Sequence, residues 1–151
     1  MLKPRRYDDM FYCCWILTKV AYQTNNFLVD VVNKIDPDYL QGLYTYADVN
    51  HCENPDKIAD EIIEDNQIPN GNFVREGVPT WSIFSKVFYR LIRDLYDAKF
   101  YPGKSLVELI VLVMNHPIGK AIDDYGTCLY CQSPECIFQC YINNDLDIMD
   151  E

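Results

Sequence analysis

Glycine is scarce in this sequence, and so are the catalytic motifs that contain it. Only 6 of the 151 residues are glycine, and no phosphate-binding loop, H-E-x-x-H motif or G-x-S-x-G motif occurs. The only two histidines, His51 and His116, have no nucleophile or carboxylate near them at a catalytic spacing. We therefore expect a protein that is not an enzyme and that carries no cofactor.

Positive charge is also scarce. Lys and Arg total 13 against 23 Asp and Glu, which gives a formal net charge of −10. A protein that binds nucleic acid needs an excess of basic side chains to displace counterions from phosphates, so we expect no nucleic-acid partner. The acidity fits a basic partner, a mimic of DNA, or simple solubility.

Long apolar runs are missing as well. The longest, residues 106–114, is interrupted by Glu108 and falls far short of the roughly 20 residues that span a membrane. Arg5 and Arg6 are followed by acidic residues rather than by the apolar stretch of a signal peptide. We therefore expect no transmembrane anchor.

Cysteine, in contrast, is well represented. Seven cysteines without an export signal indicate free thiols in a reducing compartment. Four of them could hold zinc in a tetrahedral site, namely Cys128, Cys131, Cys136 and Cys140. The last two, however, share one face of a predicted helix, where cysteine packs as a small apolar residue. We expect packing and no metal, with a zinc-stabilised helical protein as the alternative.

The spacing of the apolar residues is helical throughout. Asp36-Pro37 and Asn54-Pro55 each place a capping residue before a proline, which marks the start of a helix. Ser105 and Glu108 form the S-x-x-E pattern of a capping box. We predict helices over 6–23, 25–35, from Pro37 onward, 56–65, 80–98, 106–114, a short one up to Tyr125, and a last one after Ser133-Pro134.

Residues 80–98 are apolar on most sides, which predicts a helix that the others surround. Lys86, Arg90 and Arg93 follow one edge of it. Their stems could cover apolar surface, or their charges could line a groove and meet an acidic residue of a partner. The sequence thus predicts an all-α bundle of seven to eight helices around one apolar central helix.

One stretch within this pattern resembles the first homology motif of the Bcl-2 family. It is "REGVPTWSIFSKVF", residues 75–88. Residues 75–78 match the first half of the motif, and Trp81 takes the place of its tryptophan. Thr80 can serve as the helix N-cap that an asparagine provides in the family.

A second stretch, "AIDDYGTC" at residues 121–128, resembles the second homology motif, with Ile122, Asp124 and Gly126 in register. Residues 31–44 stand where the family carries its BH3 segment. The chain is similar to the compact viral members of the family in large DNA viruses such as poxviruses and iridoviruses. The resemblance implies a Bcl-2-like helical domain over residues 1–142, followed by an acidic C-terminal tail at 143–151.

The resemblance also implies a hydrophobic groove that takes the apolar face of a ligand helix. By position, its residues would be Tyr39, Leu43, Tyr44, Ala47, Ile62, Phe73, Thr80, Trp81, Ile83, Lys86 and Val87. Ile83 stands where the family has the arginine that pairs with the ligand's aspartate. Arg75 or Lys86 would have to provide that charge instead.

On this resemblance we expect a viral inhibitor of host apoptosis that sequesters BH3 helices of pro-apoptotic proteins such as Bim, Bak or Bax. It would act in the host cell cytoplasm, and at the mitochondrial surface through its partners. A homodimer is a further option. The alternative within the same fold is a protein without a working groove that blocks host innate signalling through surface contacts.

Overall fold

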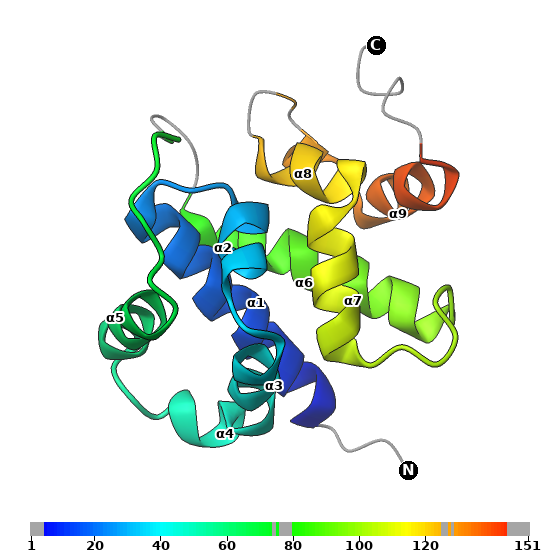
Figure 1. The fold of residues 1–151 in the computed structure, drawn as a ribbon. Coiled ribbons are helices and arrows are strands. Elements are labelled where there is room, and N and C mark those ends of the chain that lie inside the picture. The colour runs from blue at the N-terminus through cyan, green and yellow to red at the C-terminus, as the bar shows by residue number, and fades with distance from the viewer. Residues whose placement is uncertain (1–4, 74, 76–79, 125–126, 128, 145–151) are drawn as a thin grey trace.

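The computed structural model describes residues 5–73, 75, 80–124, 127 and 129–144, and within these it contains helices and no strand (Figure 1). This confirms the all-α class. The Bcl-2 type of bundle stays a prediction, and residues 145–151 of the predicted tail lie outside the described part. The helices are α1 (Arg5–Thr24), α2 (Leu28–Lys34), α3 (Pro37–Thr45), α4 (Ala47–Asn50), α5 (Pro55–Asp65), α6 (Trp81–Asp97), α7 (Leu106–Asn115), α8 (Pro117–Asp123) and α9 (Pro134–Asn143). The one-turn helix α4 was not expected from the sequence.

The helix starts follow the local signals in the sequence. The Asp36 carboxylate accepts a hydrogen bond from the Asp38 N–H at 2.8 Å, and Ser105 and Glu108 form both bonds of the capping box. These contacts pair amide groups that the first turn of a helix leaves without partners. Thr80 does precede α6, but its hydroxyl contacts the Ser82 hydroxyl at 2.8 Å and caps no backbone amide. Thr80 is therefore the N-cap residue of α6 as predicted, but its side chain makes no capping hydrogen bond.

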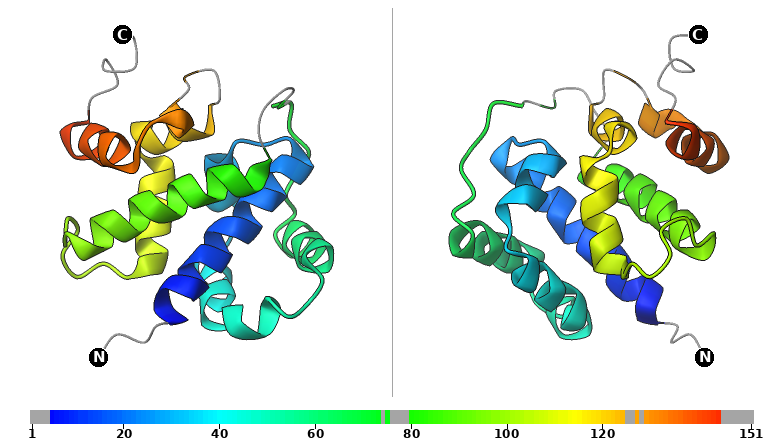
Figure 2. Two further views of the ribbon diagram at one scale, coloured as in Figure 1. Left: turned by 180° about the vertical axis from the view of Figure 1, so that it is seen from behind. Right: turned by 45° about the vertical axis from the view of Figure 1, so that its right-hand side comes forward.

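The helix at the centre of the bundle is α1 rather than α6. It contacts α2, α3, α4, α5, α6 and α7, and the ribbon views show it running through the middle of the molecule (Figures 1 and 2). Its fully buried side chains include two adjacent cysteines and a threonine: Met10, Cys13, Cys14, Ile16, Leu17, Thr18, Val20 and Ala21. The Thr18 hydroxyl donates to the Cys14 carbonyl at 2.6 Å, so burying it leaves no polar group without a partner.

Helix α6 lies across α1 on the outside of the bundle (Figure 2, left). One side of it is buried through Phe84, Phe88 and Leu95. Its other side carries an exposed stripe at three- and four-residue steps: Ile83, Lys86, Arg90, Arg93 and Asp97. Withdrawing these four charged side chains from water would cost more free energy than burial of Ile83 on the same stripe would return. The prediction of a surrounded central helix at 80–98 is wrong for this reason.

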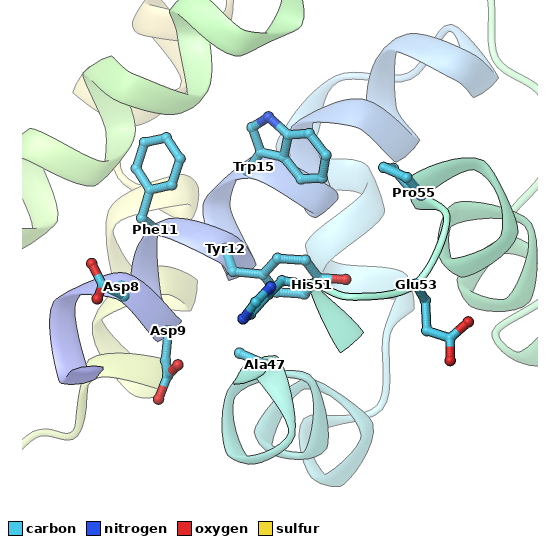
Figure 3. A pocket seen from close by; sticks show the side chains of 9 residues that line it. All are labelled: Asp8, Asp9, Phe11, Tyr12, Trp15, Ala47, His51, Glu53 and Pro55. Atoms are coloured by element: carbon cyan, nitrogen blue, oxygen red, sulfur yellow. The ribbon is translucent and has the colours of Figure 1, made fainter. Parts of the chain in front are cut away.

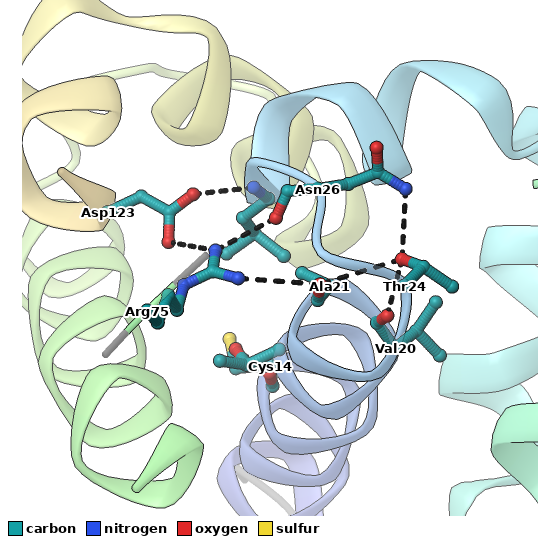
Figure 4. Close-up of polar contacts among 9 residues, drawn as sticks. Cys14, Val20, Ala21, Thr24, Asn26, Arg75 and Asp123 are labelled. Carbon is teal, nitrogen blue, oxygen red and sulfur yellow. Dashed lines mark hydrogen bonds and ion pairs between the residues drawn. The ribbon is translucent and has the colours of Figure 1, made fainter. Parts of the chain in front are cut away.

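A buried ion pair joins three segments that are distant in the sequence (Figure 4). Nη2 of Arg75 lies 3.0 Å from Oδ1 of Asp123 at the end of α8, and the two side chains are only 5% and 3% exposed. The Arg75 guanidinium also donates to the Asn26 carbonyl at 2.9 Å, between α1 and α2. Oδ2 of Asp123 accepts the Leu28 N–H, the first of α2, at 2.6 Å. The pair thus holds the α1–α2 turn, α8 and the segment before α6 together.

Backbone hydrogen bonds hold residues 71–73 against the α1–α2 turn. The Gly71 N–H donates to the Thr24 carbonyl at 2.7 Å, and the Phe73 N–H donates to the Asn25 carbonyl at 2.8 Å. The guanidinium of Arg75 then lies over the rings of Tyr22 and Phe73, at 4.1 and 4.5 Å from their centroids. Aromatic faces attract a cation, so these two rings stabilise the guanidinium in addition to the Asp123 carboxylate and the Asn26 carbonyl.

Removing one partner of this ion pair should destabilise the fold strongly. In Arg75→Met the Asp123 carboxylate loses its buried countercharge, and we expect the free energy of unfolding at pH 7 to fall by about 3–5 kcal/mol. Urea denaturation followed by circular dichroism measures this. The matched control is Arg90→Met, whose exposed i,i+4 partner is Asp94 and whose effect should stay within about 1 kcal/mol. Equal effects of the two substitutions would contradict the role given to Arg75.

The same pair makes stability depend on pH. Burial raises the pKa of the Asp123 carboxyl above its ordinary value, although the Arg75 charge opposes that shift. Because the folded protein holds this proton more tightly than the unfolded chain, the contribution of Asp123 to stability falls as pH rises through the raised pKa. Without Arg75 the preference for the protonated form increases. We therefore expect the stability deficit of Arg75→Met to shrink as pH is lowered from 7 to 4.

Helices α7 and α8 meet at a tight corner. Nδ1 of His116 accepts the Ile118 N–H at 3.0 Å, and burial lowers the pKa of this imidazole, which favours the neutral ring that can accept. A Cβ added to Gly119 would lie 1.9 Å from the Val113 carbonyl oxygen. No side chain can move aside there, because the clash is with backbone.

Gly119→Ala should therefore destabilise the protein by about 1–3 kcal/mol through overpacking. Gly42→Ala in α3 is the control, since nothing lies within 4 Å of its added Cβ. We expect that second substitution to stabilise the helix by about 0.5–1 kcal/mol. Thermal denaturation of both variants distinguishes the signs, and a stabilising Gly119→Ala would refute the packing at this corner.

Candidate functional site

The structure distributes the sequence-predicted groove residues over several places. Leu43 is 6% exposed and Ile62 is fully buried, so both belong to the core. Tyr39 and Tyr44 are half-buried and pack against that core. The Tyr39 hydroxyl donates to Asp65 at 2.8 Å, which joins α3 to the end of α5. These four residues pack within the bundle, and none of them lines any of the hollows described below.

The residues around the first motif also make contacts within the chain. Phe73 stacks on Phe27 with ring centroids 3.9 Å apart. Trp81 presents an edge contact with Trp15 of α1 at 4.7 Å, and Nζ of Lys19 lies 5.6 Å from the Trp81 ring centroid. The tryptophan therefore fastens the start of α6 to α1. Arg75 is already paired with Asp123, which leaves Lys86 as the exposed candidate for a ligand carboxylate.

Three of the predicted residues lie on the outer face of α6. Ile83 is 41% exposed, and Lys86 and Val87 line a hollow of about 260 Å³ between α6 and the start of α9. We call this region, together with its continuation along both helices, the α6–α9 cleft. Its first part is lined by Lys86, Val87, Arg90, Leu91, Gln132, Pro134 and Ile137.

The cleft continues into a second hollow of about 480 Å³ that shares Arg90 with the first. Asp94, Asp97 and Glu135 line this second part. The first part has an apolar floor with basic residues beside it, whereas the second part has three carboxylates. A ligand that lies along α6 would therefore meet positive charge towards the start of α6 and negative charge towards its end.

The basic side chains of the cleft are only weakly engaged within the protein. Arg90 pairs with Asp94 at 3.1 Å in an exposed i,i+4 contact, which contributes little in water. The ammonium group of Lys86 makes no hydrogen bond or ion pair with the described residues. Both can turn towards an incoming carboxylate without breaking a buried contact.

The second wall of the cleft, α9, was not assigned to the site from the sequence. Ser133 caps it by accepting the Cys136 N–H at 3.2 Å, and its far end is anchored by Tyr141. That hydroxyl lies 2.6 Å from the Tyr101 hydroxyl, and the ring stacks on His116 at 4.0 Å. The Ser133-Pro134 pair predicts where the helix begins, but nothing in the sequence predicts which helices α9 packs against.

The remaining predicted groove residue, Ala47, is 1% exposed and lines a different cavity. This cavity, of about 390 Å³, lies between α1 and the segment from α4 to the start of α5 (Figure 3). We call it the α1 pocket. It shares no residue with the α6–α9 cleft, so the sequence-predicted set does not form one groove.

The cysteines in the described part of the chain are free thiols. Cys131 is exposed, Cys136 half-buried and Cys140 buried against the core, while Cys128 lies outside the described residues. Within those residues no group of three or more His, Cys, Asp or Glu side chains is placed to hold a metal ion. Nor does any described helix have the length and apolar character needed to cross a membrane.

Comparison of the chain with known protein families, with curated proteins and with solved structures finds no match.

Proposed function

We propose that this protein binds the apolar face of a partner's amphipathic helix in the α6–α9 cleft. The observation that carries the proposal is the outer face of α6. There an exposed isoleucine, Ile83, and a half-buried valine, Val87, accompany Lys86 and Arg90 beside a second helix. An apolar floor with charges at its edges is the arrangement that helix-in-groove recognition uses.

The dimensions of the cleft suit such a ligand. From Lys86 to Asp97, α6 advances about 16 Å along its axis. A ligand helix with apolar anchors at i, i+3 or i+4, and i+7 needs about 10 Å of that length. Affinity would come from the anchors that reach Val87, Leu91 and Ile137, because fully desolvated apolar contacts contribute most at an interface.

Charge then selects the ligand and its direction. A carboxylate on the ligand would meet Lys86, and a basic residue further along would meet Asp94 or Asp97. The BH3 helices named by the resemblance are ligands of this kind. The function we propose is accordingly the inhibition of host apoptosis by sequestering BH3 helices of pro-apoptotic proteins, in the cytoplasm or at mitochondria that carry the partner.

Direct titration tests this proposal. Fluorescein-labelled BH3 peptides from several pro-apoptotic proteins are titrated with the full chain, and fluorescence anisotropy reports binding. We expect saturable binding at micromolar or lower concentration for at least one peptide. Val87→Asp should raise its Kd by roughly tenfold or more, because the complex would bury an unpaired carboxylate. Lys86→Glu should raise the Kd by about two- to fivefold, and less at high salt.

Two substitutions of the same chemistry serve as controls. Val49 is 59% exposed on α4, and Lys34 is exposed at the end of α2. Val49→Asp and Lys34→Glu should leave the Kd within about twofold, because neither lines the cleft. Absence of saturable binding for every peptide, or equal effects of Val87→Asp and Val49→Asp, would refute the proposal. The first result would favour action through surface contacts on innate signalling.

A further inference from the structure

The α1 pocket is a second hollow with a different chemical character from the cleft. Its floor is formed by one face of α1, where Phe11, Tyr12 and Trp15 recur at helical spacing. The opposite wall comes from α4 and the start of α5, with His51 and Glu53 (Figure 3). The cavity of about 390 Å³ is large enough for a small organic group, and aromatic rings make up most of its floor.

The rings of this floor are held in place from behind. Trp15 meets Trp81 of α6 edge-on at 4.7 Å, and Phe11 meets Tyr89 of α6 edge-on at 5.2 Å. The rings of Tyr12 and Trp15 lie 6.1 Å apart. Because α6 fixes the two outer rings, the aromatic surface is formed before any ligand arrives, and little conformational entropy is lost on binding.

The charged groups that line the pocket are acidic. Asp8, Asp9 and Glu53 line it, and no lysine or arginine does so among the described residues. Asp9 has a partner within the chain, and Glu53 makes an exposed contact with Lys57 at 3.4 Å. Asp8 is exposed and makes no ion pair with the described part of the chain. The field in the pocket therefore favours a cation.

An independent observation points to a ligand. Tyr12 is only 7% exposed, and its buried hydroxyl has no hydrogen-bond partner among the described residues. In Figure 3 the side chain projects from α1 towards the wall that contains His51 and Glu53. Burial raises the pKa of this phenol to about 12, so at neutral pH the oxygen keeps its proton and offers free lone pairs. A buried hydroxyl without a partner costs stability, which a bound donor would recover.

We propose that the α1 pocket binds an alkylammonium group, a protonated amine on a hydrocarbon stem. The stem lies against Phe11 and Trp15, whose faces also attract the cation. The ammonium donates to the Tyr12 hydroxyl, and the carboxylates of Asp8 and Glu53 at the edges of the pocket supply the negative field that attracts it. The source of this group is either a free amine or a lysine side chain of a partner protein, since both present the same chemistry.

Nuclear magnetic resonance of the full chain, labelled with ¹⁵N, tests the site. The probes are n-butylammonium chloride and the neutral n-butanol, and the indole N–H signal of Trp15 is the reporter. We expect n-butylammonium to shift this signal saturably, with a Kd on the order of 1–10 mM for so small a ligand. Butanol should bind at least about tenfold more weakly. No saturable shift, or equal affinity for both probes, would overturn the proposal.

Two variants separate binding from folding. Tyr12→Phe removes only the unpaired hydroxyl, so the melting temperature should stay or rise while the Kd for n-butylammonium increases about fivefold. Asp8→Asn should increase that Kd about threefold, against no change for Glu64→Gln, an exposed carboxylate near the end of α5. An unchanged Kd in Tyr12→Phe would overturn the role given to the hydroxyl, whatever its effect on stability.

A third probe identifies the source of the group. A short peptide with one central lysine is compared with n-butylammonium and with the same peptide carrying acetyl-lysine. If the lysine peptide binds at least tenfold more tightly than the free amine, the site recognises a protein side chain. If the two bind equally, the site recognises a small amine. The acetylated peptide should show no saturable shift, and its binding as tightly as the lysine peptide would overturn the proposal.

Discussion

The buried contact between Arg75 and Asp123 is the constraint on which the arrangement of the helices depends. It joins a segment that has no regular structure of its own to the end of α8, and it pairs amide and carbonyl groups of the α1–α2 turn. These additional hydrogen bonds offset part of the cost of withdrawing both charges from water, although the buried Nε of Arg75 makes no hydrogen bond with the described residues. The contact thus fixes α8 and the α1–α2 turn relative to each other and to Arg75.

The local features of the fold could be predicted from the sequence because their causes are local. The side chains of Asp36, Ser105 and Ser133 each accept a backbone N–H that lies two or three residues later. Both partners of each bond therefore stand close together in the sequence. Arg75 could not be understood in that way, since its carboxylate partner is separated from it by 48 positions. The resemblance suggested a ligand-facing arginine, whereas Asp123 takes that charge within the chain.

The prediction that residues 80–98 form the central helix is wrong for a related reason. Residues 80–98 and 6–23 are about equally rich in apolar residues. Lys86, Arg90 and Arg93, however, all fall on one stripe of α6, and this stripe is exposed. In α1 the buried polar residues are Thr18 and Thr24, whose hydroxyls donate to carbonyls of the same helix. Burial is decided by whether polar groups can be paired, and composition alone does not reveal that. The two hollows then differ because α6 brings both bases and acids to the cleft, whereas α1 brings acids and aromatic rings to the α1 pocket.

The position of Cys13 and Cys14 in the central helix has a chemical consequence. Burial raises the pKa of both thiols, that of Cys14 to about 12, so in the folded protein they are protonated and shielded from electrophiles. Cys52 and Cys131 are exposed. An alkylating reagent would therefore react with Cys52 and Cys131 in the folded protein. Its reaction with Cys13 and Cys14 would require the bundle to open around α1, so the rate of that reaction reports the opening.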